Sequence, residues 1–413
     1  MAQSPHKPEI FVAPGNAGTA QTAHNVAVSA TDIPALLGFA SENKVDFTFV
    51  GPEVPLAAGI VDEFESYSLS VFGPRKSAAR IESSKVFAKE LLLRYGIPCA
   101  QSQSFSDYDE ATAYVKTQGV PVVIKADGLA AGKGVTVAQT AKEALDAIKA
   151  AMRDKAFGEA GSKVVIEECL TGREMSFFAF TDGETILPMV PACDYKRIFD
   201  GGLGPNTGGM GSFSPPEFYA PTLGAQVMQT IMEPTVKALR DEGNPYSGVL
   251  YGGLMMTPDG PKVIEFNARL GDPETQAVLP RLSSDLVDIT QAVIAHRLKG
   301  VNIAWHQDAC VGVVLASGGY PGNHQIGYPI SGLEELESDV MVFHAGTKLG
   351  ANSEVLTAGG RVLSVVARGE TLDVAREKVY RNVSRIKFTD MHYRKDIALF
   401  SPEQSLAKLS ENS

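Results

Sequence analysis

The chain has 413 residues, which at about 150 residues per domain favours two or three domains. Its 44% hydrophobic and 21% charged residues are typical of a globular protein, and a net charge of −11 argues against broad binding to nucleic acid. The four dispersed cysteines include no CxxC pair, which favours reduced thiols over a zinc site or a disulfide scaffold. The chain start lacks the pattern of a signal peptide, and no apolar run approaches the ~18 residues that cross a bilayer. We therefore expect a cytoplasmic protein with neither a membrane nor a nucleic-acid partner.

Strands and helices alternate along the first hundred residues. Buried strands are predicted by the apolar runs Glu9–Ala13, Val45–Val50 and Leu69–Phe72. Helical spacing of apolar residues is found in Ile33–Ser41, Pro55–Glu65 and Ser77–Tyr95. This alternation predicts a parallel sheet whose ligands bind at the carboxyl ends of the strands.

The middle and the end of the chain are predicted to form two further units. Residues 101–172 carry strands at Val122–Lys125, Val135–Ala138 and Lys163–Glu168 and a helix at Ala141–Met152. A polar, glycine-dense loop at 194–216 and a helix at Gly224–Glu242 come next, and then a hairpin of the strands Leu250–Met256 and Lys262–Leu270. Beyond it we expect a small α+β lobe with strands at Ala309–Ala316, Val340–His344 and Val362–Ala367 and a helix at Leu372–Asn382.

A glycine-rich turn between two of these strands is the first candidate for binding chemistry. It spans Asp127–Gly134, with Lys125 before it and Lys133 within it. Backbone N–H groups in such a turn can face phosphate oxygens, and the lysines add positive charge. The spacing is neither a Walker A loop nor a Rossmann fingerprint. A flexible hairpin with a solvated lysine is an equally good interpretation of the turn alone.

The strand Lys262–Leu270 is the second candidate. Because side chains alternate along a strand, Glu265, Asn267 and Arg269 are predicted to share one face, while Ile264, Phe266 and Ala268 face the core. A carboxylate and an amide oxygen are ligands for a divalent ion that bridges nucleotide phosphates, and an arginine beside them can hold a transferring phosphoryl group. The alternative is an edge strand with solvated polar residues.

Two further segments are weaker candidates. Glu167 and Glu168 end an apolar strand, where they could bind an adenine amino group and a ribose hydroxyl, although strand-end solvation explains them as well. The loop from Asp194 to Gly211 is long and rich in glycine, which allows close backbone approach to a small ligand.

Together these segments resemble the ATP-grasp superfamily, and in particular its phosphoribosylamine–glycine ligase (glycinamide ribonucleotide synthetase) family. The resemblance runs through nearly the whole chain and is carried by Phe11–Thr19, Lys125–Val135, Gly204–Gly211, Lys262–Thr275, Val342–Lys348, Gly359–Leu363 and Arg394–Ile397. It implies an N-terminal parallel-sheet α/β domain at 1–80, an ATP-grasp domain at 81–300 with a flap at about 101–172, and a C-terminal α+β domain at 301–413.

The resemblance also implies roles for individual residues. ATP would be bound by Lys85, Lys125, Gly132, Lys133, Gly134, Glu167, Glu168, Leu170 and Glu174. The metal, Mg²⁺ or Mn²⁺, would be held by Glu265 and Asn267. Arg269 would contact the phosphoryl group or acyl phosphate as a catalytic residue, with Asp194 and Asp272 as partners for ligand amines. Substrate binding would fall to Asn16, Glu53, Lys196, Arg197, Gly208, Gly209, Arg394 and Lys395.

The implied reaction is an ATP-dependent ligation of glycine to 5-phosphoribosylamine in purine biosynthesis, through glycyl phosphate, by a monomer or weak homodimer. Members of the family ordinarily begin with a further strand and a Gly-rich turn before the Phe11 strand, and that βα unit is expected to be missing here. Two alternatives therefore stay open: a form that binds ATP and Mg²⁺ but is catalytically impaired, and an ATP-grasp ligase or carboxylase with another substrate.

Overall fold

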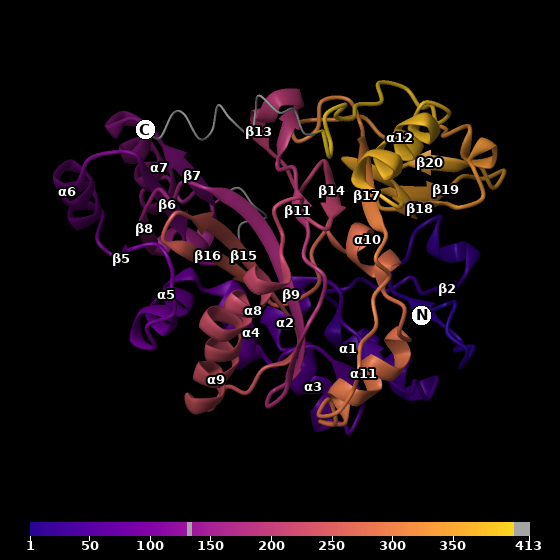
Figure 1. Cartoon of the computed structure of the whole chain (residues 1–413), viewed down its shortest axis with the longest axis horizontal. Coiled ribbons are helices and arrows are strands. Elements are labelled where there is room, and N and C mark those ends of the chain that lie inside the picture. The colour runs from indigo at the N-terminus through magenta and orange to yellow at the C-terminus, as the bar shows by residue number, and fades with distance from the viewer. Residues whose placement is uncertain (130–133, 400–413) are drawn as a thin grey trace.

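The computed structural model describes residues 1–129 and 134–399. Its N-terminal segment contains two separate pairs of parallel strands. β1 (Phe11–Val12) pairs with β2 (His24–Asn25), and β3 (Thr48–Phe49) pairs with β4 (Val71–Phe72). The 3₁₀ turn Thr19–Gln21 and the helices α1 (Ile33–Glu42), α2 (Glu53–Ala58) and α3 (Ile60–Ser66) complete this part, which lies beside the central sheet (Figure 1).

Two predicted helices are each divided in two. The single helix expected at Pro55–Glu65 is broken at Gly59, whose φ of +102° is a left-handed conformation that favours glycine. The helix expected at Ser77–Tyr95 is broken at Ser84 into α4 (Lys76–Ser83) and α5 (Lys85–Arg94). Ser84 is extended, and its hydroxyl accepts a hydrogen bond from the Phe87 N–H, so it caps α5.

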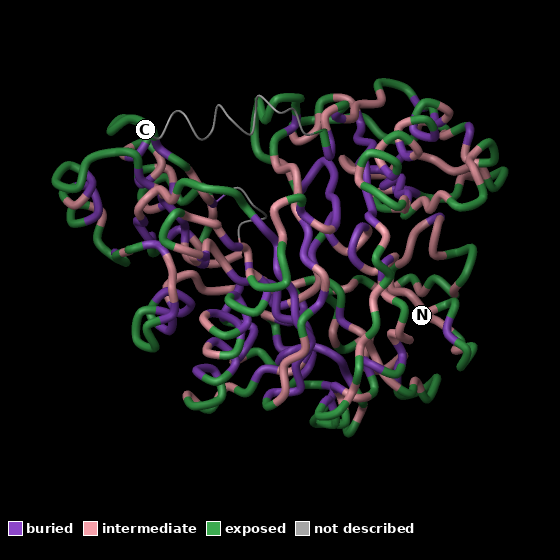
Figure 2. The backbone as a smooth tube through the Cα atoms, in the orientation of Figure 1, coloured by how far each residue is buried: buried purple, intermediate pink, exposed green. Residues whose placement is uncertain are grey.

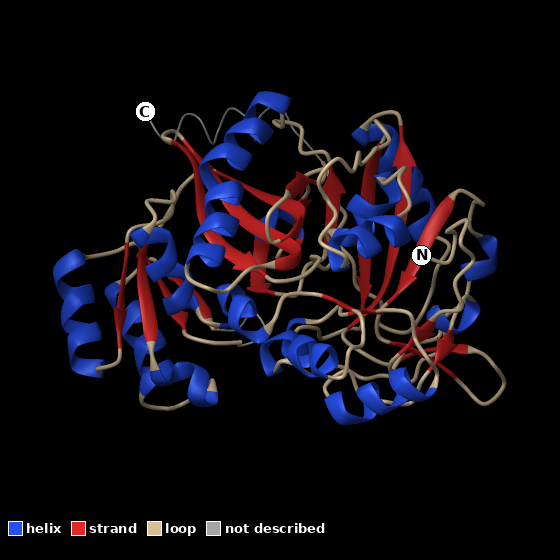
Figure 3. Ribbon diagram, turned by 90° about the horizontal axis from the view of Figure 1, so that it is seen from below, coloured by secondary structure: helices blue, strands red, loops and turns tan. Residues whose placement is uncertain are grey.

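The flap is a four-stranded antiparallel sheet in the order β5-β8-β6-β7. Its strands are β5 (Ser102–Phe105), β6 (Val122–Ala126), β7 (Val135–Ala138) and β8 (Val164–Glu168). The helices α6 (Tyr108–Gln118) and α7 (Ala141–Met152), with a 3₁₀ turn at Gly158–Ser162, pack on it around a core of their own. Figure 3 shows this unit projecting from one side of the molecule.

The central sheet has the order β10-β9-β15-β16 and is antiparallel throughout. Its strands are β9 (Arg173–Asp182), β10 (Ile186–Pro188), β15 (Ser247–Thr257) and β16 (Gly260–Asn267), and β9 was not predicted. The helix expected at Gly224–Glu242 is observed as α8 (Pro221–Val227), a π-helical turn (Met228–Met232) and α9 (Glu233–Asp241). One buried core joins this sheet to the N-terminal helices, α4 and α5 (Figure 2).

The C-terminal sheet has the order β11-β14-β17-β21-β18. Its strands are β11 (Cys193–Asp194), β14 (Gly211–Ser214), β17 (Ala309–Ala316), β18 (Val340–His344) and β21 (Arg361–Gly369), and α12 (Leu372–Val383) packs on them. A second hairpin pairs β19 (Thr347–Leu349) with β20 (Val355–Thr357), and a 3₁₀ turn lies at Leu333–Glu335.

The prediction of a continuous loop at 194–216 was wrong. This segment supplies β11 and β14 to the C-terminal sheet, and between them it forms the hairpin of β12 (Arg197–Phe199) and β13 (Leu203–Asn206), with a turn at Asp200–Gly202. α10 (Thr275–Val278), the 3₁₀ turn Leu279–Arg281 and α11 (Leu286–Ile294) lead from the central sheet to β17. Among the described residues, no helix is both long and apolar enough to span a membrane.

Candidate active site

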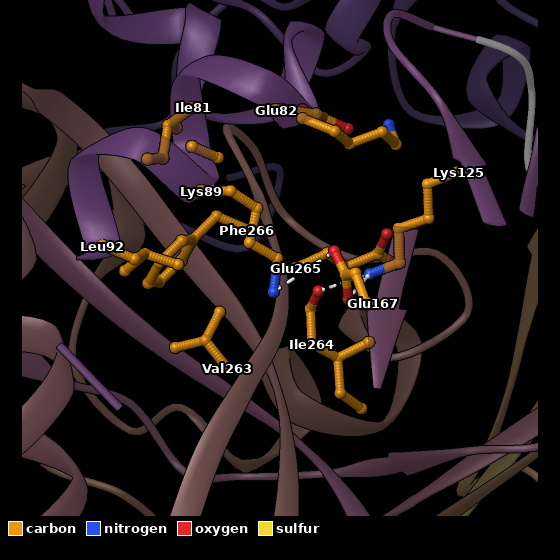
Figure 4. Close-up of a pocket in the computed structure, with 12 residues that line it drawn as sticks. Ile81, Glu82, Lys89, Leu92, Lys125, Glu167, Val263, Ile264, Glu265 and Phe266 are labelled. Atoms are coloured by element: carbon orange, nitrogen blue, oxygen red, sulfur yellow. Dashed lines mark hydrogen bonds and ion pairs between the residues drawn. The ribbon is translucent and has the colours of Figure 1, made fainter. Parts of the chain in front are cut away.

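Lysines and a glutamate gather where the flap sheet meets the central sheet. Lys125 on β6 donates from Nζ to the Ile264 carbonyl of β16 at 2.8 Å, and its Nζ lies 3.0 Å from Oε2 of Glu167 on β8. Lys89 of α5 approaches Oε1 of the same carboxylate to 3.2 Å from another side (Figure 4). Lys85, one helical turn before Lys89, lines the same cavity. Three residues predicted to bind ATP, Lys85, Lys125 and Glu167, are thus brought together.

A β-bulge shapes the next part of the site. Gly253 of β15 pairs with Glu265 while Leu254 pairs with Val263, so Ile264 is the extra residue in β16. Val263 and Phe266 are both buried, and Ile264 is only half-buried. The predicted strict alternation with Ile264 facing the core was therefore wrong, and the bulge turns the Ile264 carbonyl towards Lys125.

Glu265 and Asn267 provide oxygen atoms that fit a divalent ion. Within the described residues neither side chain makes a hydrogen bond or an ion pair, so both oxygens are available to a ligand. Burial by itself would raise the pKa of Glu265, but Lys125, Lys196, Lys85 and Arg269 together lower it, and the carboxylate stays ionised. A carboxylate and a carboxamide oxygen suit Mg²⁺ or Mn²⁺, with other oxygens completing the coordination.

Glu265 also lines a second cavity. Its lining includes Glu174, Asp194 and Lys196, and Lys196 pairs with Glu174 and lies 3.6 Å from Asp194. Burial raises the pKa of Asp194 to about 7, although Lys196 opposes that shift. Glu174, predicted to bind ATP, is thus joined through Lys196 to the predicted catalytic Asp194.

Arg269 lies beyond the end of β16 rather than within the strand, which stops at Asn267. Its Nε donates to Glu53 at 2.9 Å, and its Nη2 lies 3.2 Å from Glu82 of α4. Nη1 donates to the Leu270 carbonyl at 3.1 Å, so each of the three guanidinium nitrogens already has one partner and two of the five N–H groups are left for a ligand. Two residues predicted for different parts of the reaction, Arg269 and Glu53, are therefore in direct contact.

Asp272 and the glycine-rich segment meet at an arginine of the C-terminal sheet. Arg361 at the start of β21 forms a bidentate pair with Asp272, at 3.1 and 2.7 Å, and donates to the Gly208 carbonyl at 2.7 Å. Gly209 has a φ of +107°, and a Cβ there would lie 2.2 Å from Pro273. The backbone at Gly209 thus packs directly on the loop that follows β16.

Other predicted substrate-binding residues lie apart from this cluster. Asn16 holds its own loop, since its Oδ1 accepts from the backbone of Thr19 and its Nδ2 donates to the His344 carbonyl at 2.8 Å. Arg394 is buried, pairs with Asp396, and stacks over the ring of Tyr195 at 4.7 Å. These are the contacts of structural residues, and substrate binding by Asn16 and Arg394 stays a prediction.

The contacts of the remaining predicted residues do not test the roles predicted for them. Arg197 donates to the Gly204 carbonyl within its hairpin, and the Lys395 backbone donates to Asp200. Glu168 accepts from the Gln101 N–H at 3.0 Å, and Leu170 follows β8 in a half-buried position. Gly134 closes the turn by accepting from the Ala126 N–H, while Gly132 and Lys133 lie outside the described residues.

Sequence reasoning missed four side chains that organise this site: Lys89, Glu82, Glu274 and Arg361. Glu274 is buried and accepts hydrogen bonds from Tyr251 at 2.5 Å and Ser176 at 2.9 Å. Lys89 carried a usable signal, because residues four apart on a helix share a face and Lys85 was already a candidate. The others depend on contacts between segments far apart in the sequence.

The fold and the site define an ATP-grasp protein, in which lysines and carboxylates lie between a flap sheet and a central antiparallel sheet. Family models of phosphoribosylglycinamide synthetase match its N domain at residues 1–82, its ATP-grasp (A) domain at 83–275 and its C domain at 310–399. The chain belongs to the phosphoribosylglycinamide synthetase family, which confirms the resemblance predicted from sequence.

Individual relatives agree with this assignment. The chain is 52% identical to phosphoribosylamine–glycine ligase of Halalkalibacterium halodurans over 397 residues, covering 96% of this chain and 92% of the relative. It is 49% identical to the Yersinia pestis ligase over 400 residues, covering 96% and 93%. A crystal structure of the Thermotoga maritima ligase superposes with a TM-score of 0.83 at 32% identity, covering 96% and 95%.

A more distant solved structure shares only the fold. The biotin carboxylase domain of a Hydrogenobacter thermophilus carboxylase, solved with MgADP and bicarbonate, has a TM-score of 0.72 at 14% identity, covering 95% of this chain and 88% of the domain.

Proposed function

We propose that this chain ligates glycine to 5-phosphoribosylamine with ATP, giving glycinamide ribonucleotide, ADP and phosphate, in purine biosynthesis. The carboxylate of glycine attacks the γ-phosphorus of ATP, and the amine of phosphoribosylamine then displaces phosphate from glycyl phosphate. One observation carries the proposal: in a member of this ligase family, Lys85 and Lys125 line one cavity with Glu265, whose carboxylate makes no hydrogen bond or ion pair among the described residues.

The chain's own residues supply charge neutralisation rather than a strong base. Lys85 and Lys125 would hold the phosphates, while Arg269 would contact the phosphoryl group as negative charge moves onto the leaving oxygen. Asp194, whose pKa of about 7 suits proton exchange near neutrality, would accept a proton from a ligand amine. Asp272 would be a second partner for an amine.

Glu265 and Asn267 would hold Mg²⁺ or Mn²⁺. An ion held there would supply positive charge beside the transferring phosphoryl group. β15 offers Gly253 opposite Glu265, so that strand contributes no acidic ligand at this position.

Several finer expectations belong to the same proposal. They are the domain limits 1–80, 81–300 and 301–413, a monomer or weak homodimer, and a cytoplasmic location. The N-terminal family model matches residues 1–82, so this domain is present.

The direct test is substrate-dependent release of ADP from the purified chain. ADP should form only when ATP, a divalent metal, glycine and phosphoribosylamine are all present. Glu265→Gln should reduce kcat by about a hundredfold or more, because the charge that holds the metal is lost. If Glu265→Gln kept full turnover and metal dependence, the site assignment would be wrong.

The ADP assay and a thermal-melting measurement together distinguish the two alternatives. A rise in the melting temperature with ATP–Mg²⁺ but no turnover would indicate an impaired nucleotide-binding form. ADP release that required a different carboxylate or acceptor in place of glycine or phosphoribosylamine would indicate another ATP-grasp substrate. At 14% identity the likeness to biotin carboxylase is one of fold, and it gives carboxylase chemistry no support.

A further inference from the structure

Lys89 is a buried cation to which the proposed reaction gives no role. Its residue is 4% exposed, and it lies on α5 among Ile81, Leu92 and Phe266 (Figure 4). Its nearest charge is Oε1 of Glu167, at 3.2 Å, and neither of these two atoms has a hydrogen-bonding partner among the described residues.

Two buried ammonium groups therefore share one carboxylate. Lys125 binds Oε2 of Glu167 at 3.0 Å, which already forms a neutral pair, and Lys89 adds a second positive charge on the other oxygen. A surplus buried cation is unfavourable. Burial lowers the pKa of Lys89 and the charge of Lys125 lowers it further, while Glu167 opposes both effects. The stability of the Lys125–Glu167 pair therefore does not explain why a lysine occupies position 89.

The positive charge of Lys89 has a function when Lys125 binds a phosphate as well as Glu167. Lys125 donates to the Ile264 carbonyl and pairs with Glu167, so a phosphate would take its third N–H group and share its positive charge with Glu167. A buried carboxylate that loses part of the charge of its cation is destabilised. We infer that Lys89 is a positioning residue that keeps Glu167 paired when Lys125 turns to the phosphates of the nucleotide. The inference rests on the proposed role of Lys125 in binding ATP.

Replacement of Lys89 by methionine separates this role from simple packing. In Lys89→Met the Lys125–Glu167 pair remains neutral, so the melting temperature without nucleotide should stay the same or rise. The KM for ATP should rise by about tenfold or more with kcat within about twofold, because a phosphate on Lys125 would then leave the buried Glu167 carboxylate incompletely neutralised. Lys89→Arg should restore most of the affinity, and Lys116→Met, at an exposed lysine of the flap, should change nothing.

A double-mutant cycle with Glu167→Gln decides between the interpretations. Without a carboxylate to neutralise, Lys89→Met should raise the KM for ATP much less than it does beside Glu167. An unchanged KM in Lys89→Met, or an equal rise in both backgrounds, would overturn the inference. If Lys89→Met does not unfold cooperatively, Lys89→Gln takes its place with the same expected result. If ATP–Mg²⁺ did not raise the melting temperature of the wild-type chain, that result would instead contradict the proposed function.

Discussion

Glu82 illustrates how much of the site is decided by single buried side chains. Its carboxylate accepts the Ala268 N–H at 2.7 Å and lies 3.2 Å from Nη2 of Arg269, so it holds the turn that follows β16. Burial raises its pKa from 4.5 to about 7, with Arg269 and the Ala268 N–H opposing the shift. Between about pH 4.5 and pH 7, Glu82 therefore keeps its proton in the folded protein and has released it in the unfolded chain.

This pKa predicts a specific pH dependence of stability. Because the pKa is higher in the folded state, the stabilisation is complete below about pH 4.5 and is lost as the pH rises through 7, by about 3 kcal/mol. Glu82→Gln keeps a hydrogen-bond acceptor but cannot titrate. The difference in unfolding free energy between variant and wild type should therefore grow in favour of the variant from pH 5 to pH 8, as measured by urea denaturation. Parallel curves for the two proteins would contradict the assignment.

At the scale of elements, α5 connects the phosphate cluster to the flap. Ser84 caps the helix through the Phe87 N–H at 3.1 Å and donates to Asp127, which follows β6. Lys85 and Lys89 are the first and fifth residues of α5, so the position of its first turn determines where both ammonium groups lie.

Removal of this cap should affect nucleotide binding as well as stability. Ser84→Ala should lower the free energy of unfolding by about 1 kcal/mol and raise the KM for ATP several-fold. Thr140→Ala is the matched control, because Thr140 caps α7 in the flap, away from the lysines. Thr140→Ala should lower the free energy of unfolding by a similar amount and leave the KM for ATP unchanged. Equal effects on KM in both variants would show that α5 does not position the lysines.

The sequence predicted which segments form helices and strands better than it predicted where some of them are interrupted. Apolar periodicity indicated α7, β6, β7, β17 and α12 close to their observed limits, because each has a clear pattern of its own. It did not reveal the helix breaks at Gly59 and Ser84, since apolar spacing continues through them. Nor could it predict the bulge at Ile264, which depends on the register between β15 and β16.

For the whole molecule, the C-terminal sheet is joined to the active site by Arg361. This residue contacts both the segment at Gly208 and the loop at Asp272, so β21 fixes the separation of two segments proposed to bind substrates. Two strands of the same sheet, β11 and β14, come from residues 193–214. Contacts between such distant segments are the part of the site that a single sequence did not reveal.

Arg361→Met should therefore lower kcat without weakening ATP binding. We expect a decrease in kcat of about tenfold or more, because the loops near the reacting groups lose their alignment, and little change in the nucleotide-induced rise in melting temperature. Arg381→Met is the control, since Arg381 pairs with Glu337 on the outer surface of the same lobe. A variant at Arg361 with wild-type kcat would contradict this role for the C-terminal sheet.

The central claim is that glycine is activated as an acyl phosphate, and isotope transfer tests it most directly. Glycine labelled with ¹⁸O in both carboxylate oxygens is incubated with ATP, phosphoribosylamine and the purified chain, and the released phosphate is analysed by mass spectrometry. Attack by the carboxylate on the γ-phosphorus predicts one ¹⁸O atom in each phosphate, with the other retained in the amide of the product. Unlabelled phosphate formed together with glycinamide ribonucleotide would contradict the account.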